Sequence, residues 1–328
     1  MEQMTLLRRL WAPLAAVLLF FVAALLPRVG SVMHIRVALS LGPSSEPLIK
    51  AGELGLLPSD RFQVAELPWT SAVTRSLGNG AADVGVVTLD GILRMREGGQ
   101  RIRVLMALDE SAGADAVMAR KDISDVAGLK AKRIGFDMRG AGAYLLANAL
   151  EGEGLTMADI HPVQLVQSEM RAALQAGKVD AVVVSDPWLE IMASLGLRVI
   201  YDSTQLEIPI VRLLVASERA YQSSRAGLKT LLAAQMEMSD QIRSTSSFSG
   251  ETAILQRERL SAEEFVKVLA RSRPVDVAAN RELLAGSRPK LENVASRVEA
   301  QMRRHGLLSE PLDEAPWIDF QLLEEVVQ

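Results

Sequence analysis

One twelve-residue phrase occurs twice in this chain, and it constrains the fold more than any other feature. Residues 77–88 read L-G-N-G-A-A-D-V-G-V-V-T, and residues 174–185 read L-Q-A-G-K-V-D-A-V-V-V-S. Both fit L-x-x-G-x-x-D-x-x-V-V-[TS], which indicates a helix end, a glycine in left-handed geometry, an aspartate turn and a short buried strand. Ligands of open α/β sheets bind beyond the carboxyl ends of such strands. The repeat therefore predicts two α/β lobes facing one cleft, although any parallel α/β sheet could use such a phrase.

Composition narrows the class of protein. A chain of 328 residues has room for two lobes with separate cores. Hydrophobic content is 49% and aromatic content only 4%, so Ala, Val and Leu must build those cores. The net charge of −4 argues against a nucleic-acid-binding protein, which would carry a basic face. Cysteine is absent, which excludes disulfides, thiolate metal sites and a cysteine nucleophile.

The N-terminus reads as an export signal. Arg8 and Arg9 precede an apolar run over residues 10–26, and small residues follow at Gly30 and Ser31. This order is typical of a signal peptide. We therefore expect residues 1–31 to direct the protein to the periplasm. The run lies at the lower length limit for a membrane span, so retention as an anchor is the alternative.

Strand and helix patterns alternate from Val32 onward. This alternation predicts parallel sheets covered by helices. Crossings between the lobes are expected at residues 109–114 and 204–209, so that lobe 1 comprises residues 32–112 and 204–328 and lobe 2 residues 113–203. Amphipathic helices are expected at residues 228–242, 262–270 and 291–305. The expected strands are residues 34–41, 62–67, 83–87, 102–108, 116–120, 133–137, 160–166, 181–185, 198–202 and 211–216.

Motifs for catalysis or metal binding are not visible. The three histidines are scattered without ligand spacing, and neither a phosphate-binding G-x-x-x-x-G-K-[ST] loop nor a G-x-S-x-G elbow occurs. We therefore predict no cofactor, no metal and no catalytic residue. The segment 135–142, G-F-D-M-R-G-A-G, follows a strand and opens a helix. Its backbone N–H groups could cradle an anion or a carbonyl, or the segment could be only a tight connection.

Acidic and aromatic side chains also follow the predicted strands. Glu46, Asp90 and Asp186 are candidates for ligand contact, and helix capping explains Asp90 and Asp186 equally well. These acids favour an amine-bearing or nitrogen-heterocyclic solute over a simple oxyanion, because like charges repel. The aromatic candidates, for which core packing is the alternative, are Trp69, Tyr144 and Trp188.

Several segments together carry a family resemblance. The block 122–135, D-I-S-D-V-A-G-L-K-A-K-R-I-G, followed by A-L-Q-A-G-K-V-D-A at residues 173–181, is the most specific. With these segments, the chain resembles the solute-binding subunits of ABC importers of the nitrate/sulfonate/taurine type, which include pyrimidine-precursor binders. The resemblance covers roughly residues 35–197. The other matching segments are 47–55, 77–87, 113–120 and 144–155.

The resemblance implies a type II periplasmic-binding-protein fold, with two α/β lobes joined by two hinge crossings. It implies a non-enzymatic subunit that captures a small polar organic solute and delivers it to an ABC permease in the inner membrane. A membrane-anchored sensing domain and an enzyme acting on a small heterocycle are the alternatives. The chain lacks the lipid-attachment cysteine and the first-loop aromatic of many relatives. Together with Trp69 and Trp188, the expected ligand-binding residues are Ser44, Ser45, Glu46, Thr88, Asp90, Arg139, Gly140, Ala141, Tyr144 and Asp186.

Overall fold

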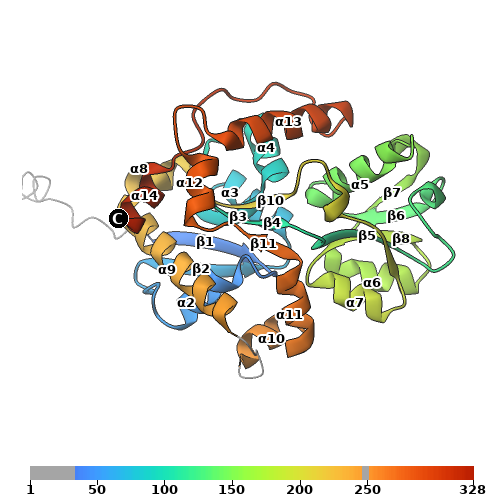
Figure 1. Cartoon of the computed structure of the whole chain (residues 1–328), viewed down its shortest axis with the longest axis horizontal. Coiled ribbons are helices and arrows are strands. Elements are labelled where there is room, and N and C mark those ends of the chain that lie inside the picture. The colour runs from blue at the N-terminus through green and yellow to red at the C-terminus, as the bar shows by residue number, and fades with distance from the viewer. Residues whose placement is uncertain (1–33, 246–250) are drawn as a thin grey trace, which may run out of the picture. The chain divides into compact units, whose positions relative to one another are not determined.

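Two mixed sheets organise the chain in this computed structural model, which describes residues 34–245 and 251–328 (Figure 1). The predicted signal peptide or anchor, residues 1–31, lies outside the described residues. Sheet A has the order β11-β4-β10-β3-β1-β2 and sheet B the order β7-β6-β8-β5-β9. The strands of sheet A are β1 (Ile35–Ser40), β2 (Phe62–Leu67), β3 (Val84–Thr88), β4 (Ile102–Ser111), β10 (Val211–Ser217) and β11 (Ser272–Pro274). Those of sheet B are β5 (Asp115–Ala119), β6 (Arg133–Phe136), β7 (His161–Gln164), β8 (Ala181–Ser185) and β9 (Arg198–Asp202).

The repeated phrase ends in strands that occupy equivalent places in the two sheets. Strand β3 lies between β1 and β10, and β8 lies between β6 and β5. Gly80 and Gly177 both adopt positive φ, 73° and 64°, as a helix C-terminus requires. The aspartate of each phrase then receives an ion pair from the neighbouring strand. Asp83 pairs with Arg36 of β1 at 2.8 Å, and Asp180 pairs with Arg133 of β6 at 2.7 Å.

The expectation of parallel sheets is wrong in both sheets, and in sheet A the edge strand β11 also runs antiparallel to β4. Strand β10 runs antiparallel to β3 and β4, and β5 runs antiparallel to β8 and β9. Each of these strands enters its sheet directly from the other sheet, through residues 112–114 before β5 and residues 203–210 before β10. Neither connection contains an α-helix, the usual link between consecutive parallel strands. Each sheet with its helices forms one α/β lobe, and the boundaries given above remain our proposal for lobe 1 and lobe 2.

Helices cover both faces of each sheet (Figure 1). Helix α5 (Ala141–Gly152) covers one face of sheet B, and α6 (Gln167–Gln175) and α7 (Trp188–Ser194) cover the other. Helices α3 (Thr70–Gly78) and α4 (Leu89–Glu97) lie against sheet A, with α2 (Glu46–Glu53) and α9 (Arg225–Ser244) on the opposite side. The apolar side chains of these strands and helices form one large buried cluster and a smaller one between sheet B, α6 and α7.

In the described residues, seven helices follow β10, the strand that returns the chain to sheet A. The expected helices at residues 228–242, 262–270 and 291–305 are confirmed, as α9, α11 and α13. Among residues 34–245 and 251–328, no helix combines the length and hydropathy that a bilayer crossing requires. Besides α9, this part contains α8 (Glu218–Ser223), α10 (Thr252–Glu258), α11 (Ala262–Ala270), α12 (Val277–Leu284), α13 (Lys290–Arg304) and α14 (Gln321–Val327). Short 3-10 turns occur at Ala127–Leu129, Met157–Asp159 and Ser203–Gln205.

Candidate ligand-binding site

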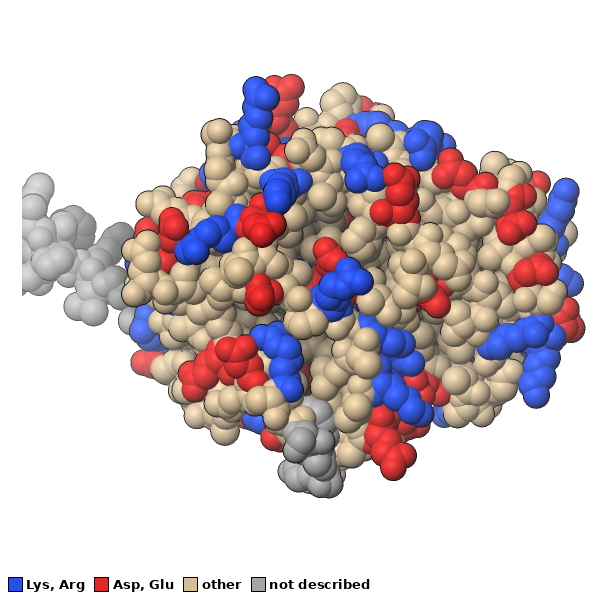
Figure 2. All heavy atoms as spheres, in the orientation of Figure 1, with Lys and Arg blue, Asp and Glu red and all other residues tan. Residues whose placement is uncertain are grey.

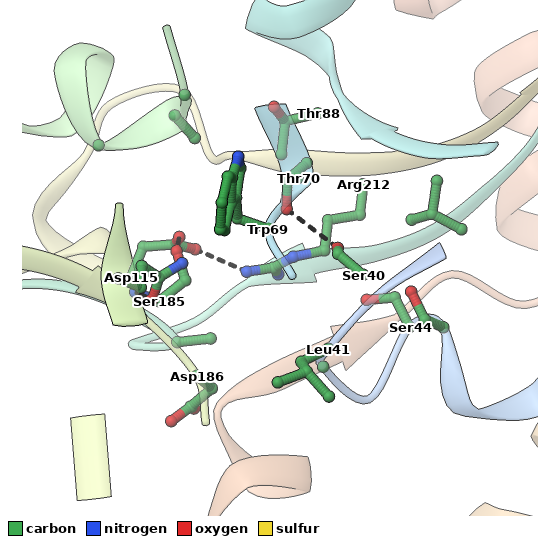
Figure 3. Close-up of a pocket in the computed structure, with 18 of the residues that line it drawn as sticks. Ser40, Leu41, Ser44, Trp69, Thr70, Thr88, Asp115, Ser185, Asp186 and Arg212 are labelled. Carbon is green, nitrogen blue, oxygen red and sulfur yellow. Dashed lines mark hydrogen bonds and ion pairs between the residues drawn. The ribbon is translucent and has the colours of Figure 1, made fainter. Parts of the chain in front are cut away.

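A polar cavity of about 70 Å³ lies where the two sheets face each other (Figure 3). The ends of β1, β3 and β8 line it, together with the loops that follow them and the start of α5. One water needs roughly 10–15 Å³ of such space, so the cavity has room for several heavy atoms and not for a large ligand. Its lining includes Ser40, Ser44, Ser45, Trp69, Thr70, Ser71, Thr88, Asp115, Asp137, Gly140, Ala141, Gly142, Gln167, Ser185, Asp186, Arg212 and Ser272.

Several helices begin in the wall of this cavity, and α3, α4 and α5 are three of them. Their N-cap residues are Trp69 for α3, Thr88 for α4 and Gly140 for α5. In these three helices the side chain of the N-cap residue accepts no hydrogen bond from the backbone of the first turn. The first turn of a helix leaves backbone N–H groups without an internal partner, and these groups carry partial positive charge. Several helix starts at one cavity therefore form an environment suited to an oxyanion.

Two side-chain donors in the same wall also lack partners. Trp69 Nε1 and Ser272 Oγ are buried, and neither has a hydrogen-bond partner among the described residues. A buried donor without a partner costs roughly 1–3 kcal/mol. A ligand acceptor in the cavity would remove that cost. Trp69 comes from lobe 1 before α3, and Ser272 comes from the edge strand β11 of the same lobe.

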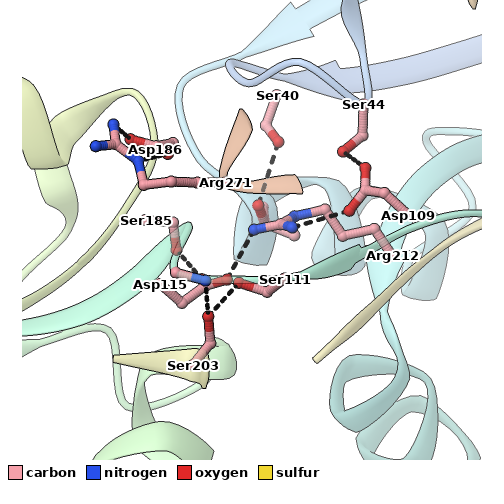
Figure 4. A network of polar contacts seen from close by, with 12 residues as sticks. Ser40, Ser44, Asp109, Ser111, Asp115, Ser185, Asp186, Ser203, Arg212 and Arg271 are labelled. Carbon is pink, nitrogen blue, oxygen red and sulfur yellow. Dashed lines mark hydrogen bonds and ion pairs between the residues drawn. The ribbon is translucent and has the colours of Figure 1, made fainter. Parts of the chain in front are cut away.

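An ion network lies beside the cavity and joins the two sheets (Figure 4). Arg212 of β10 contacts Asp109 of β4 at 3.0 Å and Asp115 of β5 at 2.8 Å. Ser44 donates to Asp109 at 2.5 Å, and Ser185 donates to Asp115. Burial alone would lower the pKa of Arg212, but the two carboxylates outweigh it and hold this pKa above its usual value. Each charge in this network is thereby matched by an opposite charge or a hydroxyl donor.

Asp186, which follows β8, is one of four charged residues that line the cavity, with Asp115, Asp137 and Arg212. Arg271 binds its two oxygens through Nε and Nη2, both at 2.8 Å, and also reaches Glu190 at 2.7 Å. Burial raises the pKa of Asp186 to about 6, and the Arg271 guanidinium offsets only part of that rise. Because Arg271 precedes β11 in lobe 1, this ion pair also connects the lobes.

Seven of the twelve residues expected at the site line the cavity, and five do not. The seven that the structure brings together are Ser44, Ser45, Trp69, Thr88, Gly140, Ala141 and Asp186. Glu46 is the fully buried first residue of α2, where it pairs with Arg257 at 2.9 Å. Asp90 is buried in the first turn of α4, and burial raises the pKa of its carboxyl.

The remaining three residues are placed by packing. Tyr144 is 1% exposed, and its hydroxyl donates to Gln301 of α13 at 2.5 Å, so it fixes α5 to the C-terminal helices. Trp188 belongs to the core between sheet B and α7. Arg139 is exposed and lies in a second, outer cavity. The alternative of core packing thus describes Tyr144 and Trp188.

Arg212, Asp115 and Ser272 also line the cavity, and none of them was predicted from the sequence. A signal existed for the first two, because each is a single charge within an apolar strand, V-R-L-L-V-A and D-A-V-M-A. A charge in such a strand must find a partner when the strand is buried. Ser272 gave no comparable signal, because the three-residue strand β11 has no apolar pattern.

Surface charge shows no sign of a nucleic-acid interface on the face in Figure 2. There, Lys and Arg side chains of the described residues lie among Asp and Glu rather than in one broad basic area. The described residues also contain no cluster of His, Cys, Asp and Glu arranged to hold a metal ion.

Comparison with known proteins gives one curated relative and many solved structures. The relative, named "Putative aliphatic sulfonates-binding protein", is from Escherichia coli K12 and is 28% identical over 152 residues. That alignment covers 45% of this chain and 48% of the relative, so the chain matches about half of the relative's length.

The solved structures show the same fold over most of the chain. The periplasmic aliphatic sulphonate binding protein SsuA from Escherichia coli has a TM-score of 0.66 at 20% identity, over 86% of this chain and 95% of its own. The alkanesulfonate-binding protein SsuA from Xanthomonas axonopodis, bound to MOPS, has a TM-score of 0.69 at 19% identity, over 85% and 95%. The desulfurization enzyme DSZB shares the fold with a TM-score of 0.60 at 16% identity, over 90% and 99%.

The fold expected from the resemblance, two α/β lobes with two crossings as in periplasmic binding proteins, is confirmed by these matches. The model of the family described as "NMT1/THI5 like" matches residues 63–246, which is more than half of the chain. This chain therefore belongs to the NMT1/THI5-like family.

Proposed function

We propose that this protein is the extracytoplasmic solute-binding subunit of an ABC importer and that it performs no chemistry on its ligand. The observation that carries the proposal is the cavity walled by both lobes, into which three helix starts and two unpartnered donors project. Binding there would hold the lobes together, and release would require them to separate. The similarity to sulfonate-binding proteins supports the same role.

The ligand class that the cavity fits best is a small organic sulfonate. The cavity offers hydrogen-bond donors: backbone N–H groups at helix starts, Trp69 Nε1 and several hydroxyls. The oxygens of a sulfonate can accept hydrogen bonds from these donors, so its binding needs no free cation. The preference for an amine-bearing solute rested on three acids. Asp186 is occupied by Arg271 and Glu46 by Arg257, while Asp90 does not line the cavity. The premise of that preference is therefore absent, and a sulfonate is the class we propose.

The same proposal includes a periplasmic location and an ABC permease as the partner. Export by residues 1–31 would bring the protein to the periplasm, as a released protein or held by an uncleaved anchor. The partner would be an ABC permease of the inner membrane. The mass of the mature protein after fractionation separates release from anchoring, and recovery of the full-length chain in the cytosol would contradict export.

An enzyme on this fold is the second candidate, because DSZB shares the architecture. Prolonged incubation of each bound ligand with the purified protein, followed by mass spectrometry, distinguishes the two. The binding role predicts unchanged ligand, and multiple turnovers would establish the enzyme instead.

Calorimetry with a panel of alkanesulfonates, taurine, nitrate and pyrimidines tests the ligand class. Trp69→Phe removes the free Nε1 donor while keeping an aromatic ring, and we expect it to weaken sulfonate binding about tenfold, or about 1.4 kcal/mol. Trp188→Phe is the matched control, because Trp188 lies in the core away from the cavity. Equal affinities of the two variants, or no binding of any sulfonate by the wild-type protein, would contradict the proposal.

A further inference from the structure

A second cavity adjoins the first at its outer side. Its volume is about 530 Å³, and Ser71 lines both cavities. Its walls come from α3 and α4 of lobe 1 and from the loop before α5 of lobe 2. We call this space the vestibule. Because the two cavities share Ser71, a solute held in the inner cavity would reach the vestibule past this residue and contact both lobes there.

Three arginines line the vestibule: Arg75 of α3, Arg94 of α4 and Arg139 before α5. The ion pairs of the described residues include none of these three side chains, although elsewhere in the fold arginines such as Arg36, Arg212 and Arg257 are bound to carboxylates. Arg94 donates through Nη1 to the backbone oxygen of Leu307, and its Nε and Nη2 are buried without a hydrogen-bond partner.

The acidic groups near the vestibule do not neutralise it. Glu97, its one carboxylate among the lining residues, accepts hydrogen bonds from the backbone of Ser309 and Glu310 at 2.5 and 2.8 Å. Asp90 lies near Arg94, but burial raises the pKa of this carboxyl and so favours its uncharged form. The other lining residues are uncharged, and Thr74, Asn79 and Gln100 among them are polar. The vestibule is therefore a positively charged space in a chain whose net charge is −4.

We propose that the vestibule binds an oxyanion group at the far end of the solute, so that the protein selects solutes carrying a second negative charge. This inference rests on the proposed function, because the solute's first anionic group must occupy the inner cavity. Arg139 belongs to lobe 2, and Arg75 and Arg94 belong to lobe 1. A carboxylate, sulfonate or phosphate between them would attract both lobes at once and favour the closed cleft.

Paired ligands of equal chain length test the second charge directly. Calorimetry should compare alkanemonosulfonates with α,ω-alkanedisulfonates, from the ethane to the hexane member, against the wild-type protein. We expect the best disulfonate to bind at least tenfold more tightly than its monosulfonate. This advantage should shrink as salt is added, because exposed charges are screened.

Three variants locate the effect. Arg75→Gln and Arg139→Gln lie at exposed positions and should each remove most of the disulfonate advantage while leaving monosulfonate affinity within twofold. Arg243→Gln is the control. It removes the same positive charge, but from an exposed ion pair with Asp240 on α9. It should preserve the disulfonate advantage.

The outcomes separate this inference from the proposed function. If monosulfonates bind and disulfonates bind no more tightly at any length, the vestibule proposal is overturned and the proposed function stands. An advantage that survives both Arg75→Gln and Arg139→Gln also overturns it. If neither ligand class binds the wild-type protein, the proposed function fails and this inference fails with it.

Discussion

Arg271 and Asp186 form a two-point ion pair that joins the lobes beside the ligand cavity. The two contacts, Nε to Oδ2 and Nη2 to Oδ1, are both 2.8 Å, and the Asp186 side chain is 1% exposed. Arg271 is the C-cap of α11, just before β11 of sheet A, whereas Asp186 follows β8 of sheet B. Separation of the lobes would break this pair, so the pair would stabilise the arrangement in which the lobes are close together.

Removing this pair should open the cleft. Arg271→Gln leaves Asp186 buried and unpaired in the closed form, which costs several kcal/mol and favours separation of the lobes. We expect a larger radius of gyration by small-angle X-ray scattering and sulfonate affinity at least tenfold weaker. Arg273→Gln is the control, because Arg273 is 72% exposed and pairs with Glu110 within lobe 1. The same scattering curve for both variants would show that the pair does not hold the lobes.

Asp186 should also make stability depend on pH. Its pKa is about 6 in the folded protein against an ordinary value of 3.8, so the folded state binds the proton more tightly than the unfolded state. The stabilisation from that proton is fully present below 3.8 and is lost as the pH rises through about 6. Urea unfolding of wild type and Asp186→Asn across this window measures the effect. The difference in unfolding free energy between the two proteins should shift across this window, and a constant difference would contradict the prediction.

Local patterns predicted the strands because each is a short apolar run bounded by turn residues. Residues 62–67, 181–185 and 198–202 were predicted with the bounds that the structure has. Strand β11 was not predicted, because its three residues, S-R-P, carry no periodic signal. It forms only by pairing with β4 in the folded chain. The antiparallel direction of β5 and β10 was not predicted, because the hydrophobic pattern of a strand does not show from which end the chain enters the sheet.

The charge balance of the site could not be read from the sequence. Glu46 and Asp186 resemble free carboxylates in a linear reading, yet Arg257 and Arg271 arrive from the helical C-terminal part, more than eighty positions away. Likewise, Tyr144 follows the loop at Gly140 but lies on the face of α5 that packs against α13. The loop position was predictable from spacing, and the partner of each side chain depended on the assembled fold.

The start of α5 offers a direct test of backbone contact with the ligand. Gly140 has φ −100° and ψ 177°, which any residue can adopt, and an added Cβ would lie 3.4 Å from Asp137 Oδ2. Gly140→Val should therefore fold normally, but its methyl groups would fill the space at the helix start. We expect sulfonate affinity to fall more than tenfold while the free energy of unfolding changes by less than about 1 kcal/mol. Gly140→Ala should show a smaller loss, and unaltered calorimetry of a folded Gly140→Val variant would mean that the loop is only a connection.

Arg212 should be the arginine on which stability depends most, because it is the cation between two buried carboxylates. Its side chain is 15% exposed, and those of Asp109 and Asp115 are 7% and 3% exposed. Arg212→Met would leave two like charges together without a counter-ion, for which a loss of about 3–5 kcal/mol is expected. Arg133→Met is the matched control, because the Arg133 side chain is 45% exposed and its ion pair with Asp180 should contribute little to stability. Urea unfolding measures both.

If Arg212→Met does not fold, adding Asp109→Asn and Asp115→Asn should restore folding, since the two amides remove the unpaired charge. Equal losses in Arg212→Met and Arg133→Met, or no rescue by the amides, would show that the network does not stabilise the crossing between the sheets.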